Sequence, residues 1–439
     1  MQSIETAFPI IEALKAKGHQ AFLVGGCVRD HLFDRPTKDV DVATSATPDE
    51  VGQIFQGVKL VGASFGVCLV PAGDEAIEVA TFRRDGVYMD GRRPEDVVFG
   101  SMEEDAARRD FTINALYMTP EGAIIDHVGG MVDFCARLLR CVGDPQKRFQ
   151  EDALRLLRAI RFASRLGLTI EDETWKAMVE LAPTITRISA ERQREEITRM
   201  LMHESAFDAM KLMVESGLME HLLPEVTDLA KITDQGPHHP EGDALTHTLL
   251  CVKNLERRSA VLGWVALLHD IGKAKTFSIG EDGIPHFYEH AIVGADMARV
   301  IVQRFKFSLE DQEAITRLVY RHMLPLSGVE GWKKKTFKRF LGDEQCEDLL
   351  TFSKSDILSS SGDMSPLHRL EEAREEFVLA DEPVRPDPLI GGRDLIELGY
   401  KPGPLFSTIL TRVEDEQLEG ELSTREDAIV FVQEHFPST

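Results

Sequence analysis

The sequence has few cysteines and no pattern that would pair them. The six cysteines, at positions 27, 68, 135, 141, 251 and 346, form no CxxC pair and no regular framework. We therefore expect reduced thiols rather than a disulfide scaffold, and a reducing compartment, the cytoplasm.

Basic residues are also in short supply. The chain has 50 lysines and arginines against 74 aspartates and glutamates, a formal net charge of −24. This balance argues against a protein that coats nucleic acid by bulk attraction, because counterion release needs lysine and arginine near the phosphates. Any nucleic acid must therefore meet a local basic surface.

Long apolar runs, internal repeats and low-complexity tracts are absent. The opening MQSIETAFPIIEALKAKG has no basic stretch followed by an apolar core, so we expect neither a signal peptide nor a membrane partner. At 439 residues, 43% of them apolar, the chain is too long for one core, and we expect about two to four domains.

The periodicity of apolar residues changes along the chain. Residues 1–130 mix short β-rich runs (QAFLVGG, KDVDVATS, GVCLVPAG, AIEVATFRR) with helical stretches, whereas the rest is almost entirely helical. This predicts an α+β protein: a head at 1–130, a helical neck at 131–200, a helical body at 201–384 and a C-terminal tail at 385–439. The proline-bearing DEPVRPDPLIGG marks the last boundary.

Two aspartates in KDVDV are candidate metal ligands. In a strand, Asp39 and Asp41 would point to the same face, because side chains alternate. Converging carboxylates suit hard divalent cations, and a two-metal site can serve phosphoryl transfer. Glu78 lies on a strand that could neighbour them and is a further candidate. A lone DxD is nonetheless frequent on exposed strands.

Two glycines precede these aspartates. Gly25 and Gly26 would let the backbone approach a ligand, and the following CVRDHLF looks like a helix start whose free N–H groups favour phosphate. Arg29 could add positive charge there. A lone GG pair would be merely a turn.

Together, GG-x-VRD and DVD resemble the signature of the polymerase-β-like nucleotidyltransferases. Four further stretches extend the resemblance to the class II tRNA nucleotidyltransferases, the CCA-adding enzymes and their poly(A) polymerase relatives. They are RRDFTINAL (108–116), GGMVDFCARLLRCVGDP, EDALRLLRAIRFASRLG and VYMDGRRPEDVVF. The late LIGGRDLIELGYKPGPLFSTIL is similar to the family's C-terminal part.

The resemblance implies a fold and a set of roles. It implies a polymerase-β-like head with a small mixed sheet, a two-metal Mg²⁺ site, CTP and ATP as nucleotides, and tRNA as partner. The RRD motif would contact the ribose, the GGMVDF stretch would be a hinge, and VYMDGRRPEDVVF would be the flexible loop that switches specificity. The implied nucleotide-binding residues are Gly25, Gly26, Arg29, Arg108, Arg109, Asp110, Asn114, Glu151, Asp152, Arg155, Arg158 and Arg161.

The stretch EDALR offers a way to read a base without a template. Asp152 and Arg155, three residues apart, would share one helix face. The exocyclic amino group of C or A can donate to Asp152, and the adjacent ring nitrogen can accept from Arg155, whereas U and G present the reverse. Glu151 could orient Arg155. In an isolated helix the same pair would be a surface salt bridge.

The following arginines, Arg158, Arg161 and Arg165, could hold a triphosphate or an RNA backbone. A solvated helix side is the equally weighted alternative.

A second set of residues resembles the HD phosphohydrolase superfamily. Its stretches are ALTHTLL, LLHDIGK, YEHAIVG, YRHML and KSDIL, and its implied metal ligands are His247, His269, Asp270, His290, His322 and Asp356. Imidazoles and carboxylates suit a transition metal such as Ni²⁺ or Mn²⁺. In HD-bearing bacterial relatives such a domain acts on nucleotide 2′-phosphate or 2′,3′-cyclic ends.

The densest basic run is WKKKTFKRF at 332–340, which favours either contact with RNA phosphates or a solvated helix face.

We therefore predict a CCA-adding tRNA nucleotidyltransferase with an additional HD-type phosphohydrolase domain. The alternatives within the class are an A-adding enzyme and a poly(A) polymerase; a CC-adding enzyme would be expected to lack the flexible loop. The alternatives outside it are an HD hydrolase with an RNA-binding head and a non-catalytic tRNA-binding module. Both disagree with the joint presence of the two aspartates, RRD and EDALR.

Overall fold

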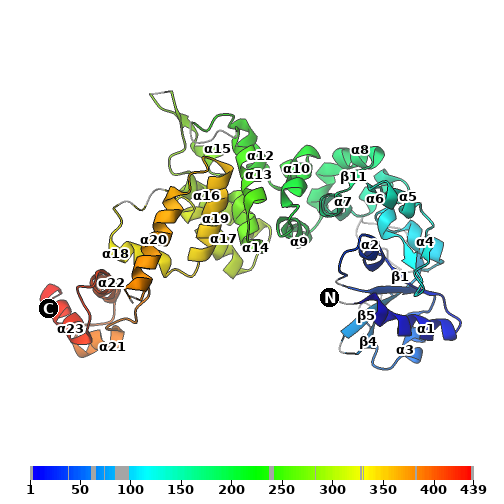
Figure 1. Cartoon of the computed structure of the whole chain (residues 1–439), viewed down its shortest axis with the longest axis horizontal. Helices are drawn as coiled ribbons and strands as arrows, with labels where there is room; N and C mark the ends of the chain where they lie inside the picture. Colours follow the sequence, from blue (N-terminus) through cyan, green and yellow to red (C-terminus); the bar gives the residue numbers. More distant parts are fainter. Residues whose placement is uncertain are drawn as a thin grey trace. The chain divides into compact units, whose positions relative to one another are not determined.

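The computed structural model describes residues 3–37, 39–60, 66–73, 75–84, 98–236, 242–281, 283–326, 329, 331–380 and 383–436. They form two compact units, residues 1–227 and 228–439, which are drawn together in Figure 1. Within the described ranges, no helix is both long and apolar enough to cross a membrane.

A mixed sheet forms the first part of unit 1. Its order is β3-β4-β5-β2-β1-β8-β9, and only the central pair β2 and β5 is parallel, with Asp41 opposite Glu78. The strands are β1 (Ala21–Val24), β2 (Asp41–Thr44), β3 (Lys59–Leu60), β4 (Val67–Ala72), β5 (Glu75–Thr81), β8 (Tyr117–Met118) and β9 (Ile124–Ile125). The four β-rich runs of the head are therefore strands, as the sequence predicts, and the α+β fold is confirmed.

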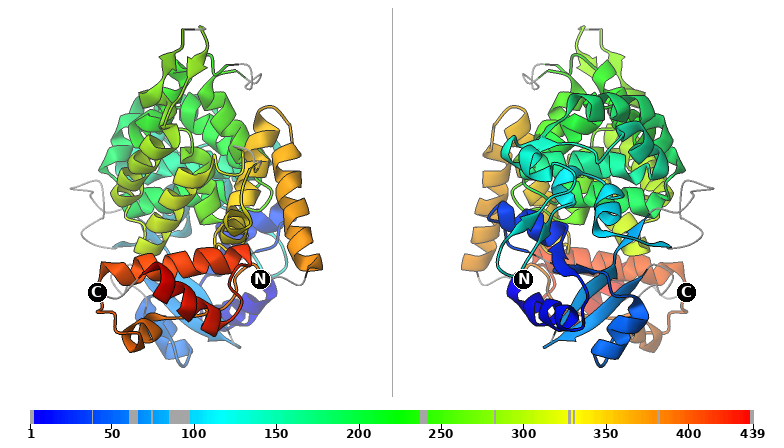
Figure 2. Two further views of the ribbon diagram at one scale, coloured as in Figure 1. Left: turned by 90° about the vertical axis from the view of Figure 1, so that its left-hand side faces the viewer. Right: turned by 90° about the vertical axis from the view of Figure 1, so that its right-hand side faces the viewer.

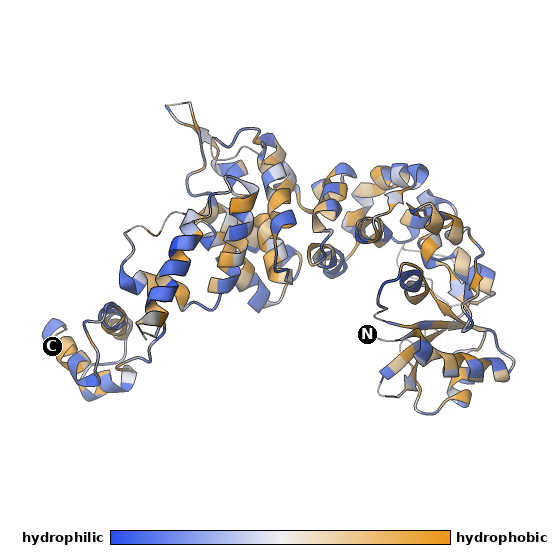
Figure 3. Cartoon of the chain, in the orientation of Figure 1, coloured by the Kyte–Doolittle hydropathy of each residue, from blue (hydrophilic) through white to orange (hydrophobic). Residues whose placement is uncertain are grey.

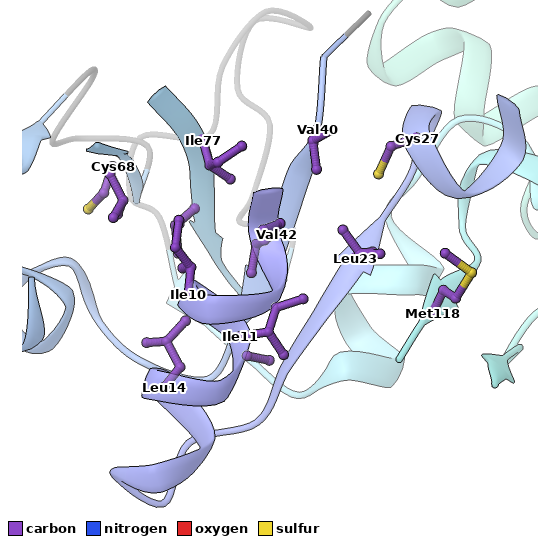
Figure 4. Packing of buried hydrophobic residues seen from close by; sticks show 14 of the residues in the cluster. Ile10, Ile11, Leu14, Leu23, Cys27, Val40, Val42, Cys68, Ile77 and Met118 are labelled. Atoms are coloured by element: carbon purple, nitrogen blue, oxygen red, sulfur yellow. The ribbon is translucent and has the colours of Figure 1, made fainter. Parts of the chain in front are cut away.

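Helices α1 (Phe8–Ala16) and α3 (Pro48–Ile54) cover one face of this sheet (Figure 1). Figure 4 shows Ile11 of α1 packed with Leu23 and Val42 of the strands, all fully buried. Val40 belongs to the same cluster. Because side chains alternate along an extended chain, Asp41, which lies between Val40 and Val42, faces the other side.

The rest of unit 1 is mainly helical, apart from two short strand pairs. Its helices are η1 (Ile4–Ala7), α2 (Gly26–Leu32), α4 (Met102–Ala107), η3 (Thr112–Asn114), α5 (Gly130–Cys135), α6 (Pro145–Glu151), α7 (Leu154–Leu166), α8 (Asp172–Leu181), η4 (Ala182–Arg187), α9 (Ala190–Leu201), α10 (Ala206–Glu215), α11 (Leu218–Leu222) and α12 (Pro224–Thr227). The short pairs are β6 (Arg83–Arg84) with β7 (Val98–Phe99), and β10 (Leu138–Leu139) with β11 (Thr169–Ile170).

Unit 2 is almost all helical. Its helices are η5 (Asp228–Lys231), α13 (Ala244–Asn254), α14 (Ala260–Leu268), α15 (Lys273–Thr276), α16 (His290–Arg304), α17 (Leu309–Arg321), α18 (Lys334–Leu341), α19 (Cys346–Ser359), α20 (Ser365–Leu379), α21 (Gly392–Glu397), α22 (Pro404–Glu419) and α23 (Arg425–His435). A small hairpin joins β12 (Ser278–Ile279) to β13 (Pro285–His286).

Helices of both units are amphipathic, with one apolar face and one hydrophilic face. Figure 3 shows hydrophobic and hydrophilic residues alternating along the helices of both units, the pattern expected when one face packs and the other meets water. Figure 2 shows α22 and α23, in red, side by side. Apolar residues of α21, α22 and α23, among them Leu395, Ile409 and Val432, form a hydrophobic cluster of their own.

Candidate active sites

The carboxylates of the KDVDV stretch lie at one end of β2. This strand begins at Asp41, so Asp39 precedes it rather than lying within it. The alternation nevertheless holds, because Val40 is buried between an exposed Asp39 and a half-buried Asp41. Burial first, and then the charges of Glu78 and Asp39, raise the pKa of Asp41 to about 6. A divalent cation would relieve this repulsion, so the donor set fits a metal site.

Gly25 occupies a backbone conformation that only glycine readily adopts. Its φ is 73° and its ψ is −124°, and it directly precedes α2, which begins at Gly26, one residue before the predicted start. A Cβ at Gly25 would also stand 3.1 Å from Nη1 of Arg109. The glycine therefore serves both the turn and the close approach of this arginine.

A buried aspartate that sequence reasoning missed holds the RRD arginines. Helix α4 starts with a capping box between Ser101 and Glu104. Asp105 follows, 1% exposed. Its Oδ1 accepts from Arg108 at 2.9 and 2.5 Å, and its Oδ2 accepts from Arg109 at 3.2 and 3.0 Å. Tyr117 donates to Oδ2 at 2.7 Å. Asp105 therefore fixes the position of both guanidinium groups.

A second polar network orients the rest of this motif. Asp110 accepts from Nε and Nη2 of Arg158 at 2.9 and 2.7 Å, and from Nδ2 of Asn114 at 3.0 Å. Asn114 in turn accepts from Nη1 of Arg29 at 2.7 Å. Burial would raise the pKa of Asp110, but Arg158 and the hydrogen bonds lower it to about 2.

The EDALR stretch does not form one continuous helix, and in this respect the sequence prediction is wrong. Helix α6 ends at Glu151, Asp152 is extended with φ −150° and ψ 102°, and α7 begins at Leu154. The cause is local: Oδ1 of Asp152 accepts from the backbone N–H of Leu154 at 3.1 Å, and such a bond competes with the helix. Oδ2 accepts from Nη2 of Arg192 on α9 at 3.0 Å.

Arg155 is fixed more firmly than Asp152. Its Nη1 donates to Oε2 of Glu151 at 2.8 Å and to the carbonyl of Arg148 at 2.9 Å. Its Nη2 donates to the carbonyl of Arg108 at 3.3 Å. Glu151 thus holds Arg155, the orienting contact predicted for it.

One cleft of about 450 Å³ collects most of these residues. Its lining comprises Gly25, Gly26, Arg29, Asp41, Arg108, Arg109, Asp110, Asn114, Asp152, Arg155, Arg158, Arg161, Phe162 and Arg165. Arg29, Arg158 and Arg161 all stack on the ring of Phe162, at 4.7, 5.2 and 4.3 Å from its centroid. Arg161 is only 8% exposed and pairs with Glu196 at 2.6 Å, so the alternative of a solvated helix side is wrong for this arginine.

The predicted flexible loop, VYMDGRRPEDVVF, lies outside the described residues except for Val98 and Phe99 of β7.

All six predicted HD ligands come together inside unit 2. His247 lies on α13, His269 and Asp270 directly follow α14, His290 opens α16, His322 follows α17, and Asp356 lies on α19. The ligand atoms form two groups whose members lie within 4.8 Å of one another: His247, Cys251, His269 and Asp356, and Asp270, His290 and His322. Cys251 was not predicted.

Backbone carbonyls fix the imidazole tautomers. Nδ1 of His269, His290 and His322 lies 3.1, 2.9 and 2.6 Å from the carbonyls of the residues three positions earlier. An N–H at Nδ1 leaves the Nε2 lone pair for a metal. Burial and the neighbouring His269 also lower the pKa of His322 to about 3, which keeps that ring neutral.

Asp270 belongs to the second group and also contacts the first. Its Oδ1 is 3.6 and 3.8 Å from Nε2 of His290 and His322, and its Oδ2 is 3.2 Å from Nε2 of His269. The buried Lys273, which was also not predicted, places Nζ 2.7 Å from Oδ2. This nitrogen and carboxylate donor set fits a transition-metal site.

Gly272 allows α16 to pack closely against the segment that carries His269 and Asp270. A Cβ there would stand 2.1 Å from the carbonyl oxygen of His290 and 2.6 Å from the backbone nitrogen of Gly294. The glycine of LLHDIGK is thus a contact point between α16 and the segment that carries His269 and Asp270.

The basic run at 332–340 is partly neutralised within the protein. Lys335 and Arg339 of α18 pair with Asp415 of α22 at 2.9 and 2.6 Å, and Arg339 also reaches Glu414 at 2.9 Å. The Arg339 side chain is still 40% exposed, so both a solvated helix face and contact with RNA stay predictions for this run.

The site in unit 1 defines a class of protein, the nucleotidyltransferases. The family described as "Poly A polymerase head domain" matches residues 21–140. The family described as "Probable RNA and SrmB- binding site of polymerase A" matches 167–229, and "HD domain" matches 238–360.

Whole-chain similarities narrow the class. CCA-adding enzymes of Streptococcus suis (strain 05ZYH33) and Streptococcus pneumoniae (strain CGSP14) are 32% and 33% identical over 97% of this chain and 95% and 96% of theirs. The crystal structure of the Bacillus stearothermophilus CCA-adding enzyme in complex with CTP superposes with a TM-score of 0.76 at 28% identity, over 99% of this chain and 98% of that one. The chain belongs to the family of CCA-adding enzymes.

Proposed function

We propose that the chain adds C, C and A to the 3′ end of tRNA, using CTP and ATP and no nucleic-acid template. The observation that carries the proposal is that one cleft holds a carboxylate suited to metal, seven arginines and the pair Asp152 and Arg155. Binding and activating a triphosphate needs the carboxylate and the arginines. Selecting a base without a template needs the pair Asp152 and Arg155.

Each part of the cleft has a role in this reaction. Asp41, which lines the cleft, and Asp39, with Glu78 as neighbour, would hold Mg²⁺ ions that lower the barrier for attack of the 3′-hydroxyl on the α-phosphate and release of pyrophosphate; Asp39 and Glu78 lie outside the lining itself. The guanidinium groups around Phe162 attract the phosphates, and Arg108, Arg109 and Asp110, held by Asp105 and Arg158, would contact the ribose.

Base selection falls to Asp152 and Arg155. Asp152 can only accept hydrogen bonds and Arg155 can only donate them, so C and A satisfy both side chains. U or G would leave both unpaired, which costs about 1–3 kcal/mol for each buried group. Arg155 is already held in place by Glu151, which reduces the entropy lost on binding.

The test uses tRNAs that end before CCA, after the first C and after the second C. Each is incubated with CTP alone, ATP alone or both, and the products are sequenced. We expect C, C and A to be added in order and addition then to stop. Addition of A alone would instead indicate an A-adding enzyme, and a long A tail would indicate a poly(A) polymerase.

A double variant, Asp39→Ala with Asp41→Ala, provides the negative control. It should bind tRNA with nearly unchanged affinity and add no nucleotide, because the RNA is held elsewhere. Near-normal incorporation would refute the assignment of these aspartates.

We further propose that unit 2 is a metal-dependent phosphohydrolase acting on nucleotide 2′-phosphate or 2′,3′-cyclic ends. The observation in its favour is that all six predicted ligands gather around Asp270, five of them buried and His290 nearly so. The metal would be Ni²⁺, Mn²⁺ or a similar ion, whose bound water would serve as the nucleophile.

The double variant His269→Ala with Asp270→Ala tests this second activity. It should lose hydrolysis of a 2′,3′-cyclic nucleotide and its bound metal, yet keep CCA addition, because all cleft residues belong to the other unit. Loss of CCA addition in a variant that unfolds at the normal temperature would contradict two separate sites.

We also propose that the chain is divided into a head (1–130), a neck (131–200), a body (201–384) and a tail (385–439).

We propose a cytoplasmic location as well. It fits the six free cysteines, five of them buried, which a reducing compartment would maintain.

A further inference from the structure

Cys251 lies in unit 2, one helical turn from His247 on α13. The two side chains, four residues apart, share a helix face. Cys251 is completely buried, and its Sγ is 3.4 Å from Nε2 of His247. The only cysteine of α13 therefore points at the metal-binding cluster rather than into the apolar core.

Four possible metal-donor atoms lie close together beside Cys251. The donors of His247, Cys251, His269 and Asp356 lie within 4.8 Å of one another, and Nε2 of His247 is 3.2 Å from Oδ1 of Asp356. Ligands about 2.0–2.3 Å from a tetrahedral ion are themselves roughly 3.5 Å apart. The two separations from Nε2 of His247, 3.4 Å to Sγ of Cys251 and 3.2 Å to Oδ1 of Asp356, are close to this value.

His269 supplies an independent sign of a ligand at this point. Its side chain is fully buried, and its Nε2 makes no hydrogen bond of ordinary geometry among the described residues, although Oδ2 of Asp270 lies 3.2 Å away. Because Nδ1 faces the carbonyl of Ala266, Nε2 is directed into the cluster. A buried nitrogen without a partner is costly unless something binds it.

We propose that the Cys251 thiolate is a direct metal ligand, and that it makes this site selective for thiophilic ions such as Zn²⁺, Co²⁺ or Ni²⁺ over Mg²⁺ or Mn²⁺, which removes Mn²⁺ from the ions proposed above. The inference rests on the proposed metal-dependent function of unit 2. On binding, the S–H bond breaks, a metal–sulfur bond forms and the proton passes to solvent. Thiolates favour soft ions, whereas carboxylates and water suit hard ones.

The simplest alternative is a structural thiol that donates an S–H hydrogen bond to His247. This alternative predicts a metal site built only from imidazoles and carboxylates. The two cases differ in the absorption spectrum of bound Co²⁺, because only a cobalt–thiolate bond gives a sulfur-to-metal charge-transfer band in the near ultraviolet.

The experiment titrates the metal-stripped full-length protein with Co²⁺, with equilibrium dialysis to measure binding. Visible d–d bands report an occupied site regardless of sulfur, and the near-ultraviolet band reports the thiolate. We expect both in the wild type, d–d bands alone in Cys251→Ser, and both in the matched control Cys346→Ser, which alters the other buried cysteine of unit 2. Zn²⁺ affinity should fall about tenfold or more in Cys251→Ser, and Mn²⁺ affinity much less.

Four results would overturn the proposal. Stoichiometric Co²⁺ without a charge-transfer band in the wild type would leave the metal site standing and remove Cys251 from it. A charge-transfer band that survives in Cys251→Ser would likewise remove Cys251 from the site. Equal losses of Zn²⁺ and Mn²⁺ affinity in that variant would show that Cys251 does not make the site selective. If no Co²⁺ binds and no phosphohydrolase activity is found, the proposed function of unit 2 fails as well.

Discussion

Selectivity for the base should depend on Asp152 while being independent of the arginine that holds it in the free protein. The ion pair between Asp152 and Arg192 is partly exposed, with 32% and 44% of the two side chains accessible. Solvent screening limits such a pair to about 0–1 kcal/mol. A matched base contact is worth about 1–3 kcal/mol, so an incoming C or A can displace Arg192.

Asp152→Ala should therefore reduce the preference for CTP over UTP by roughly five- to 150-fold, the range that corresponds to one contact. Arg155→Ala should do the same through the ring nitrogen. Arg155→Lys should not restore the preference, because the ammonium lacks the planar fork that Glu151 and two carbonyls hold in place.

The assay is single-turnover incorporation from mixtures of the four nucleotides, with Arg192→Ala as the matched control. That variant removes the partner of Asp152 but no contact to the base, so its C:U ratio should change less than about threefold. A uniform loss of rate with an unchanged C:U ratio in Asp152→Ala would show that the pair is structural. Equal loss of selectivity in Arg192→Ala would show that the ion pair, rather than the base contact, matters.

Three other substitutions test the packing and charge of the two sites. Gly272→Ala should remove bound metal from unit 2 while sparing nucleotide addition, because the new Cβ would overlap the carbonyl of His290; metal analysis and a CCA assay measure both. Gly25→Ala should cost about 1–3 kcal/mol in unfolding free energy and weaken CTP binding, because φ is +73°, and normal binding would contradict the close-approach argument. Asp110 has a pKa lowered to about 2, so its contribution to stability is complete above the unfolded pKa near 3.9 and is lost as the pH falls toward 2. The stability of the wild type should thus fall by about 1 kcal/mol more than that of Asp110→Asn between pH 6 and pH 3 in urea titrations, unless the pair with Arg158 contributes nothing.

The sequence predicted the fold, and it named residues that the structure brings together in each unit, because ordered motifs and apolar periodicity are local signals. The alternation around Val40 placed Asp39 and Asp41 correctly even though β2 starts only at Asp41. The roles of the individual residues stay predictions. The continuous helix through EDALR was wrong because periodicity does not reveal that Asp152 bonds to the N–H of Leu154.

Other residues were missed because their surroundings are set by distant segments. Asp105 looks like an ordinary residue of a capped acidic helix until the arginines fold back onto it. Cys251 and Lys273 each lie one turn from a predicted ligand, a spacing that could have drawn attention to them. The importance of Gly272 depends on the packing of α16, for which the sequence offers no signal.

The composition of the cleft has a consequence for how substrates arrive. Its lining holds seven arginines and three aspartates, a surplus of four positive charges, in a chain whose net charge is −24. The remainder therefore carries a net −28, which on average repels a polyphosphate. This difference in charge steers nucleotides toward the cleft, since their encounters with the acidic surface are short and those with the cleft are prolonged. Dissolved salt screens the attraction and the repulsion between charges more than about a nanometre apart. A rise in ionic strength should therefore slow capture of nucleotide more than it slows the chemical step.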